Sequence, residues 1–270
     1  MSRVNLLFKI DEQICKIYNI SMYMRSLFTD KSCLKKNVTL KTIDHDFCFV
    51  IGNGPSLTFE DLEAIKVYPT FTVNFFHKGC PEFPSTYHVL LDPCFGNEEC
   101  LPYVLDLYDS HSTTKFITRQ NVAKQLLTLN KVDRIFGTYP VLAQYRDFVR
   151  CNMTKSMTGS VNVIPFAIQC ALYMGYKNIF LLGCDFNSYA NLKVEHFYKH
   201  GKDRMTSIGE DLRWSSFVHY HHYALQAYAQ RTDCKIINLT PGSLIDAYPR
   251  NSLNLILNKI EKKNNDFKAY

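Results

Sequence analysis

The stretch Phe47-Cys48-Phe49-Val50-Ile51-Gly52-Asn53-Gly54-Pro55-Ser56-Leu57 places five apolar residues directly before a glycine-rich turn. An acidic segment of helical character, residues 59–65, follows at once. A strand that is apolar on both faces is typical of the middle of a parallel sheet, and two glycines permit backbone dihedrals that other residues resist. The stretch therefore predicts a strand, a tight turn and a helix in that order.

The turn itself allows two interpretations. Free N–H groups in a glycine turn beside a helix N-terminus form a seat for a phosphate or another anion. Pro55 fits the first turn of a helix, where Ser56 can supply a hydroxyl. The spacing matches neither the dinucleotide fingerprint nor a P-loop. A nucleotide-type site and a purely structural turn both stay open at this point.

Strands and helices alternate along the rest of the chain. Further strands are expected over residues 71–76, 86–91, 115–118, 134–136, 177–185 and 234–239, and helices over 102–109, 121–129, 161–174 and 214–231. Gly175 is expected to end the helix before it. This alternation predicts a Rossmann-like single α/β domain, with a mostly parallel sheet and helices on both faces.

The predicted organisation has three parts. An amphipathic helical extension covers residues 1–40, with its helix over 4–28. A Rossmann-like nucleotide-binding domain of glycosyltransferase type covers 41–258 and contains a polar, lid-like loop at about 187–213. A polar tail covers 259–270. We expect the N-terminal helix to pack on the domain, with docking on a membrane surface as the alternative.

The composition is that of an ordinary soluble globular protein. The 270 residues are 46% hydrophobic and 21% charged, and the formal charge of +6 mildly favours anionic ligands. The sequence contains no recognised nucleic-acid motif. The ten cysteines show no C-x-x-C pair and suggest buried thiols in a reducing compartment. Without a secretory signal or an apolar run long enough to cross a membrane, a cytoplasmic location is expected.

Polar residues are expected to collect at the carboxyl ends of the strands, where ligands bind in such sheets. Asn74 and Asp92 could recognise a hydroxyl or a base, and Asp185 could bind a metal or a ribose. Thr158-Gly159-Ser160 could form a second anion seat at a helix N-terminus. Each residue could instead be a cap or a turn former. The other residues expected at this rim are Gly52 to Ser56, Gly183 and Thr240 to Ser243.

Histidines provide the candidate bases. His196 and His200 have the i, i+4 spacing of a zinc pair, but no Glu follows His196, so a metal site is not favoured. His219, His221 and His222 lie on the helix predicted after the loop. A histidine beside an acceptor hydroxyl could act as general base, because its ordinary pKa lies near neutral pH.

Several motifs, taken in order, resemble two related families. They are residues 49–57, Thr158-Gly159-Ser160, residues 171–186 and residues 238–244. The sequence resembles the bacterial sialyltransferases that use CMP-sialic acid within a single Rossmann-like domain. It is also similar to domains typified by the archaeal 6-hydroxymethylpterin diphosphokinase, whose bacterial members accompany surface-polysaccharide and flagellin-glycosylation proteins. The motifs together cover residues 47–250.

The resemblance to the sialyltransferases implies a site around CMP and transfer without a metal. The binding residues implied or expected are Gly52, Asn53, Gly54, Ser56, Asn74, Asp92, Thr158, Gly159, Ser160, Gly183 and Asp185. The match loosens at three places. Asp92 stands where the family has a second asparagine, and Asn187 stands where it has a phosphate-binding tyrosine. No histidine falls at the position of the base, His219 being nearest in register. His219 and His196 are therefore the expected catalytic residues.

The resulting hypothesis is a glycosyltransferase that moves a sialic-acid-type sugar from a CMP-sugar to a glycan acceptor in lipopolysaccharide or capsule biosynthesis. It needs no cofactor besides the donor. A cytoplasmic location, peripheral contact with the inner membrane and a homo-oligomer are compatible with it. The alternatives are a diphosphokinase using ATP, with Mg²⁺ on Asp92 and Asp185, and a non-catalytic nucleotide-binding subunit.

Overall fold

A computed structural model describes residues 3–29, 31–131, 133–141, 149–190, 193–194, 196–198, 202–203 and 207–268. At its centre is a seven-stranded parallel sheet in the order β11-β8-β1-β2-β3-β4-β5. The strands are β1 (Phe47–Ile51), β2 (Thr70–Val73), β3 (Tyr87–Leu90), β4 (Lys115–Arg119), β5 (Ile135–Thr138), β8 (Asn178–Leu182) and β11 (Lys235–Asn238). The predicted parallel sheet is confirmed, and β1 lies inside it as expected.

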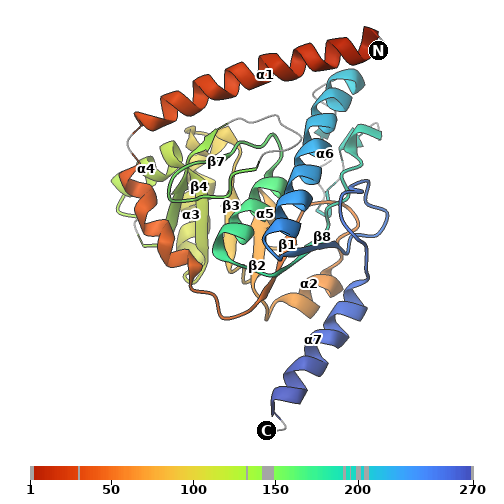
Figure 1. Cartoon of the computed structure of the whole chain (residues 1–270). Helices are drawn as coiled ribbons and strands as arrows, with labels where there is room; N and C mark the ends of the chain where they lie inside the picture. The colour runs from red at the N-terminus through yellow and green to blue at the C-terminus, as the bar shows by residue number, and fades with distance from the viewer. Residues whose placement is uncertain are drawn as a thin grey trace.

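Helices cover both faces of the sheet (Figure 1). One face packs on α5 (Val163–Met174), α6 (Ile208–Arg231) and the 3₁₀ segment η1 (Ser32–Lys41). The other face packs on α2 (Phe59–Ile65), α3 (Leu101–Ser110), α4 (Gln120–Thr128) and α7 (Leu253–Lys268). Side chains of a strand alternate between faces, so Val50 joins the first core and Phe49 the second. The fully apolar strand is thus buried on both sides.

Two helix starts differ from the prediction, and that of α2 is confirmed. α2 begins at Phe59 behind a capping box of Thr58 and Asp61, so Pro55 and Ser56 belong to the turn before it and not to its first turn. α5 begins at Val163 with Asn162 as its cap, because the Asn162 side chain accepts from the Ile164 N–H. α6 begins at Ile208 and takes the last residues of the predicted loop. The predicted end of α5 is confirmed: Gly175 caps it in the left-handed conformation, with φ +102°.

The two ends of the described chain are helical. α1 (Arg3–Leu27) lies across one end of the molecule, and α7 projects at the other (Figure 1). α7 covers most of the segment expected to be a polar tail. Within the described residues, none of the helices combines the length and apolar character needed to cross a bilayer.

The smaller elements lie in the connections between the main strands and helices. They are η2 (Phe76–Lys78), η3 (Pro93–Gly96), η4 (Ser188–Ala190), the parallel pair β6 (Pro140–Val141) and β7 (Met157–Thr158), and the antiparallel pair β9 (Lys193–Val194) and β10 (Lys202–Asp203). η1 is tied to the sheet by Asn37, whose side-chain amide donates to the carbonyls of Gly137 and Met153, both at 2.7 Å. The described cysteines are free thiols, and burial raises the pKa of Cys48 and Cys170.

A cluster of three histidines lies beside β3. The ring of His77 lies 4.9 Å from that of His88 and 4.2 Å from that of His111, measured between centroids. Burial, reinforced by the nearby His111, lowers the pKa of His77 to about 4. Burial also lowers the pKa of His88 well below its ordinary value. The folded protein therefore holds His77 and His88 neutral near pH 7.

This cluster predicts acid sensitivity. In the unfolded chain His77 titrates at an ordinary pKa of about 6.5, so between pH 6.5 and 4 the unfolded state binds more protons than the folded state. The free energy of unfolding should fall over that window, with His77 alone contributing about 3 kcal/mol. Urea unfolding of His77→Gln should show a shallower fall, while the exposed control His45→Gln should follow the parent. Equal slopes for the parent and His77→Gln would contradict this assignment.

Candidate functional site

The direction in which strands are added reverses between β1 and β8. The chain adds β2 to β5 on one side of β1, then returns through α5 to add β8 and β11 on the other. Loops leaving two such strands diverge to opposite sides and open a crevice at their carboxyl ends, where α/β proteins bind ligands. The turn after β1 begins at Gly52, and the turn after β8 begins at Gly183.

These two turns cross in very close contact. A Cβ atom added to Gly54 would lie 1.8 Å from Asp185 Oδ2, and one added to Gly52 would lie 2.3 Å from the carbonyl oxygen of Gly183. Gly183 itself has φ +61°, a conformation that favours glycine. Glycine is therefore required at positions 52, 54 and 183, because the two turns approach too closely for a side chain.

The N–H groups of the first turn are largely used inside the protein. Gly52 N–H donates to the Leu182 carbonyl and Gly54 N–H to the Gly183 carbonyl, both at 2.8 Å, and Ser56 N–H donates to Asp185 Oδ1 at 3.2 Å. The expectation that these amides are free to seat a phosphate is wrong for these three groups. They join the turns after β1 and β8.

Asp185 braces this junction. Asp185 as a whole is 7% exposed, and its carboxylate also accepts from the Ser56 hydroxyl at 2.8 Å. Burial raises the pKa of Asp185, and the hydrogen bonds from Ser56 act in the opposite direction. Both carboxylate oxygens thus have protein partners, which gives Asp185 a structural task in addition to its place in the crevice.

Two adjoining cavities lie along this edge of the sheet. The β1–β8 cavity holds about 250 Å³ and the β3–β4 cavity about 410 Å³, and Asn74 and Val163 line both. Of the predicted residues, the first is lined by Gly52, Asn53, Gly54, Asn74, Gly183, Asp185 and His196. The second is lined by Asn74, Asp92, Gly159 and Ser160. Ser56, Thr158 and His219 line neither.

Thr158 is held inside the protein. It is 3% exposed, its hydroxyl oxygen accepts from the Arg150 N–H at 2.8 Å, and its carbonyl accepts from Gln169 Nε2 at 3.1 Å. The Ser160 hydroxyl donates to the Asn162 carbonyl at 2.6 Å. Because Asn162 caps α5, Thr158 to Ser160 do not form the helix N-terminus expected of them. Gly159 and Ser160 keep a place in the wall of the β3–β4 cavity.

The two asparagines present polar atoms to the crevice in different ways. Asn53 Nδ2 donates to the Val73 carbonyl at 3.4 Å, while its Oδ1 is buried and has no hydrogen-bond partner within the described residues. Asn74 adopts φ +47°, and its Oδ1 accepts from the Leu91 N–H at 3.1 Å. A buried carbonyl oxygen without a partner costs free energy, so Asn53 is suited to a ligand donor.

The two acids proposed as a magnesium pair lie apart. Asp92 lines the β3–β4 cavity and accepts from the Cys94 N–H at 3.0 Å, whereas Asp185 lines the β1–β8 cavity. In the part of the chain that the structure describes, no three His, Cys, Asp or Glu side chains cluster in a way that could hold a metal ion. The two carboxylates expected for the diphosphokinase alternative thus line different, adjoining cavities.

Arg119 and Trp214 are cavity residues that the sequence did not identify. Both line the β3–β4 cavity. Arg119 ends β4, and its Nε donates to the Leu91 carbonyl at 2.8 Å. Burial lowers the pKa of Arg119, and the Asp92 carboxylate opposes that shift. The position of Arg119 at the carboxyl end of a predicted strand could have identified it from the sequence. Trp214 could not be identified in this way, because it reaches the cavity only through the packing of α6.

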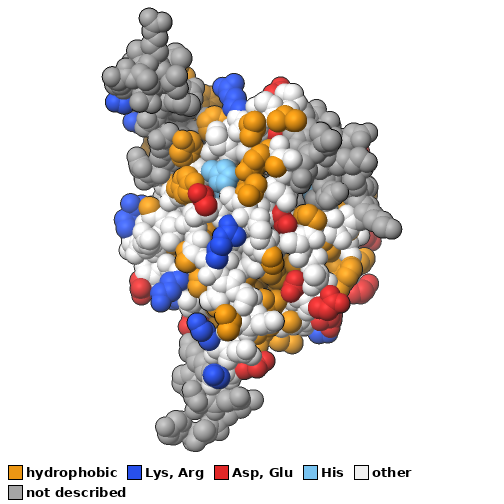
Figure 2. All heavy atoms as spheres, turned by 90° about the vertical axis from the view of Figure 1, so that its right-hand side faces the viewer, with side chains coloured by type: hydrophobic (Ala, Val, Ile, Leu, Met, Phe, Trp, Pro, Cys, Tyr) orange, Lys and Arg blue, Asp and Glu red, His pale blue; other side chains and the backbone are white. Residues whose placement is uncertain are grey.

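The histidines separate into different positions. His196 lines the β1–β8 cavity, and its segment is held at the turn by the Phe197 N–H, which donates to the Asn53 carbonyl at 3.1 Å. His200 lies outside the described residues. His219 instead lines a third, open cavity of about 400 Å³. Figure 2 shows one face of the molecule, on which hydrophobic side chains gather around a histidine.

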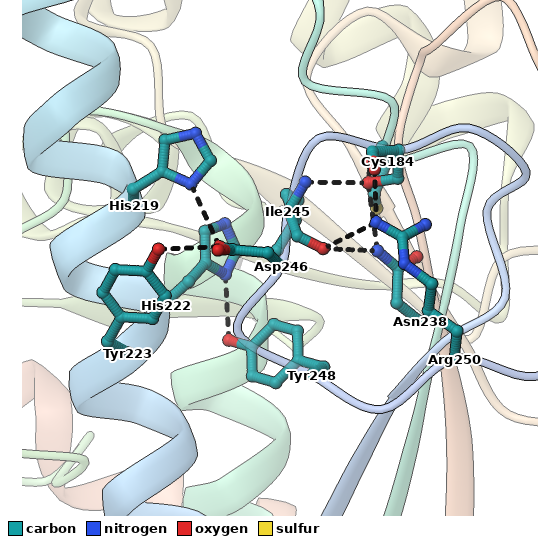
Figure 3. Close-up of polar contacts among 10 residues, drawn as sticks. Cys184, His219, His222, Tyr223, Asn238, Ile245, Asp246, Tyr248 and Arg250 are labelled. Carbon is teal, nitrogen blue, oxygen red and sulfur yellow. Dashed lines mark hydrogen bonds and ion pairs between the residues drawn. The ribbon is translucent and has the colours of Figure 1, made fainter.

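His219 is next to the β1–β8 cavity without lining it. Its Nδ1 lies 3.8 Å from Asp246 Oδ1, which also accepts from the Tyr223 hydroxyl at 2.7 Å (Figure 3). Burial lowers the pKa of His219, and the Asp246 carboxylate opposes the shift. Phe186 lines the β1–β8 cavity with its ring centroid 5.0 Å from that of His219. One aromatic ring therefore lies between this histidine and the crevice.

His222 is the histidine of α6 that does line the β1–β8 cavity. It is fully buried, and its Nδ1 lies 2.8 Å from the Tyr248 hydroxyl (Figure 3). The sequence placed His222 on the correct helix but contained no sign that this position, three residues beyond His219, faces the crevice.

Comparisons with known proteins find similarity at the level of structure only. Neither protein-family models nor curated protein sequences match this chain. One similar solved structure is the sialyltransferase CstII from Campylobacter jejuni in complex with the substrate analogue CMP-3FNeuAc, with a TM-score of 0.49, 15% identity, and coverage of 77% of this chain and 87% of that one. Another, CST-II with a trisaccharide acceptor and CMP, has a TM-score of 0.46, 15% identity and the same coverage. What this chain binds is therefore inferred from its own residues.

The contact between the turns predicts a large difference between two glycine substitutions. Gly54→Ala puts a methyl group against Asp185 and should lower the free energy of unfolding by about 2 kcal/mol, as overpacking does. Gly209→Ala, in α6, meets no atom within 4 Å and should leave stability unchanged or raise it by up to about 1 kcal/mol. Denaturant unfolding of both variants tests this. Similar losses in the two variants would show that the turns do not depend on their close approach.

Proposed function

We propose that this protein is a sialyltransferase-like glycosyltransferase that takes a sugar from a CMP-sugar donor. The observation that carries the proposal is the convergence of distant segments. Asn53, Asn74 and Asp185, which the motif resemblance assigns to CMP, line one cavity at the switch point of the sheet. The adjoining β3–β4 cavity continues the crevice past Gly159 and Ser160. Together the cavities offer room for a nucleotide and an attached sugar.

In this proposal the reaction is a single displacement at the anomeric carbon of the donor sugar. The acceptor hydroxyl attacks that carbon, the bond from the carbon to the CMP phosphate oxygen breaks, and CMP leaves with the electron pair. The acceptor proton passes to a histidine base. Holding both substrates in one crevice supplies the orientation that such a displacement needs.

His219 and His196 are the proposed bases, and they line different cavities. His196 lines the β1–β8 cavity itself. His219 lies beside it next to Asp246, a carboxylate that would stabilise the imidazolium formed when the ring takes a proton. An acceptor in the open cavity of His219 would lie next to Phe186 at the margin of the donor cavity.

The biological setting is part of the same proposal. An acceptor glycan of lipopolysaccharide or capsule, a cytoplasmic location and assembly into a homo-oligomer suit a transferase with a nucleotide-sugar donor. The free thiols of the described cysteines support a reducing compartment.

Nucleotide preference is the direct test. The purified protein should gain more thermal stability from CMP than from AMP or ATP at equal concentration, because the crevice is proposed to recognise cytidine. Asn53→Ala should weaken CMP binding about tenfold, since it removes the buried carbonyl oxygen proposed to accept from the ligand. The exposed control Asn254→Ala should bind CMP like the parent. Activity can be followed by CMP release from CMP-sialic acid.

Two results would redirect the assignment. Stronger stabilisation by ATP with Mg²⁺, abolished by a chelator, would point to the diphosphokinase alternative. Binding of CMP without turnover of any CMP-sugar would point to a non-catalytic nucleotide-binding subunit.

α1 supports the proposed peripheral contact with a membrane. Ile10, Ile14, Ile17, Ile20 and Met24 recur at spacings of three and four, which puts them on one side of the helix. Each is between 48% and 69% exposed. Lys9 and Arg25 on the same helix favour an anionic lipid surface.

Vesicle binding tests this contact. The parent should sediment with vesicles rich in an anionic lipid more strongly than with neutral ones, and Ile14→Ser with Ile17→Ser should reduce that binding at least severalfold. The control Val67→Ser changes an exposed apolar residue elsewhere and should bind like the parent. If the double variant instead changes the mass in solution, the apolar side of α1 is a contact between copies of this chain.

A further inference from the structure

The β1–β8 cavity contains a buried polar atom that the proposed chemistry has not used. His222 is fully buried and lines this cavity, and within the described residues its Nε2 has no hydrogen-bond partner. The other ring nitrogen, Nδ1, is occupied by the Tyr248 hydroxyl at 2.8 Å. A buried nitrogen without a partner is costly in the empty protein, which makes it a candidate contact for a ligand.

Tyr248 determines which nitrogen of His222 carries the proton. The phenol is 3% exposed, and burial raises its pKa well above the ordinary value, so it keeps its proton at neutral pH. In the described part of the chain, the only hydrogen-bond partner of that hydroxyl is His222 Nδ1. The phenol has one hydrogen to donate, and a buried donor needs an acceptor. His222 Nδ1 therefore accepts, and the hydrogen of the neutral ring is on Nε2.

The ring is neutral in the folded protein. Burial, with smaller effects from His221 and His219, lowers the pKa of His222 well below its ordinary value. The neutral ring with a protonated Nε2 is a hydrogen-bond donor and a poor base. It is suited to binding an oxygen atom, and the role of general base falls to the other histidines.

The N-terminus of α5 reaches the same cavity. Asn162, Val163 and Ile164 line it, and they are the cap and the first two residues of a twelve-residue helix. The helix dipole favours an anion at this end, where Ile164 already donates its N–H to the Asn162 side chain and Pro165 has no N–H to offer. The positive end of α5 and the buried ring of His222 thus border one cavity.

We propose that His222 Nε2–H and the N-terminus of α5 together bind one phosphate group in the β1–β8 cavity. The sequence suggested that the N–H groups of the glycine turn would bind the phosphate. Three of those groups are bonded within the protein, so the proposed phosphate seat uses other residues of the same cavity. The proposal rests on the proposed function only for the identity of the nucleotide. In the proposed reaction the phosphate belongs to CMP. The Nε2 hydrogen of His222 then stabilises the negative charge that builds up on the phosphate oxygen as its bond to the sugar breaks.

Calorimetric titration of the full chain with CMP, cytidine and inorganic phosphate tests the seat. The parent should bind CMP at least tenfold more tightly than cytidine, because only CMP carries the phosphate. His222→Phe with Tyr248→Phe removes both hydrogen-bonding partners together, which avoids leaving either one buried and unpaired. In this double variant CMP affinity should fall about tenfold to a hundredfold, while cytidine affinity stays the same. His45→Gln, an exposed histidine, is the matched control.

The tautomer provides a readout that a merely structural histidine would not alter. In ¹⁵N spectra of histidine-labelled protein, His222 should be protonated at Nε2 and unprotonated at Nδ1, and the Nε2 signal should shift when CMP is added. Tyr248→Phe should allow the other tautomer and weaken CMP binding less than the double variant does. A proton on Nδ1 in the parent would overturn the proposal.

The outcomes separate this proposal from the function. If CMP binds and its advantage over cytidine is unchanged in the double variant, the seat is refuted and the proposed function stands. If CMP does not bind but phosphate or AMP binds and is lost in the double variant, the seat stands and the function is wrong. If no phosphate-bearing probe binds the parent, both are refuted.

Discussion

The contact between the turns after β1 and β8 is the constraint on which the crevice depends. Asp185 accepts two hydrogen bonds from Ser56 across this junction, and the Gly54 N–H donates to the Gly183 carbonyl. Gly54 has no room for a side chain there. Asp185 as a whole is 7% exposed, and its carboxylate needs such partners, because an unpaired buried charge is very costly. The junction of the two turns is therefore rigid. Few residue types other than those present could occupy the positions of Gly54, Ser56 and Asp185.

The residues that line the β1–β8 cavity come from elements far apart in the chain. Cys184 and Asp185 are also tied to the loop after β11, since the Ser243 hydroxyl donates to the Cys184 carbonyl at 2.7 Å and the Leu244 N–H to the Asp185 carbonyl at 2.9 Å. The same loop brings Tyr248 against His222 of α6. One network of hydrogen bonds thus connects the sheet edge, this loop and the histidine-bearing helix. It positions donors and acceptors around the β1–β8 cavity before any ligand arrives.

Sequence reasoning predicted the strands and most of the helices well, for a physical reason. Strands buried on both faces must be continuous apolar runs, and the run at residues 47–51 is visible without any structure. Helix starts were less predictable. α2 begins at Phe59 as predicted, with Thr58 as its cap, and Pro55 and Ser56 lie in the turn before it. α5 has Asn162 as its cap, whereas Thr158, expected near that start, is used in packing. Several residues near the start of each helix could have served as its N-cap, and tertiary contacts determined which of them does.

The sequence by itself determined the layered α/β architecture and the edge of the sheet at which polar residues gather, because apolar periodicity and strand order follow from local pattern. It did not determine which N–H groups remain free, which histidine faces the crevice or which nitrogen carries its proton. Those depend on partners more than twenty residues away, as Tyr248 is from His222 and Asp185 is from Ser56. Such pairings exist only once the chain has folded, so the tertiary structure alone decided them.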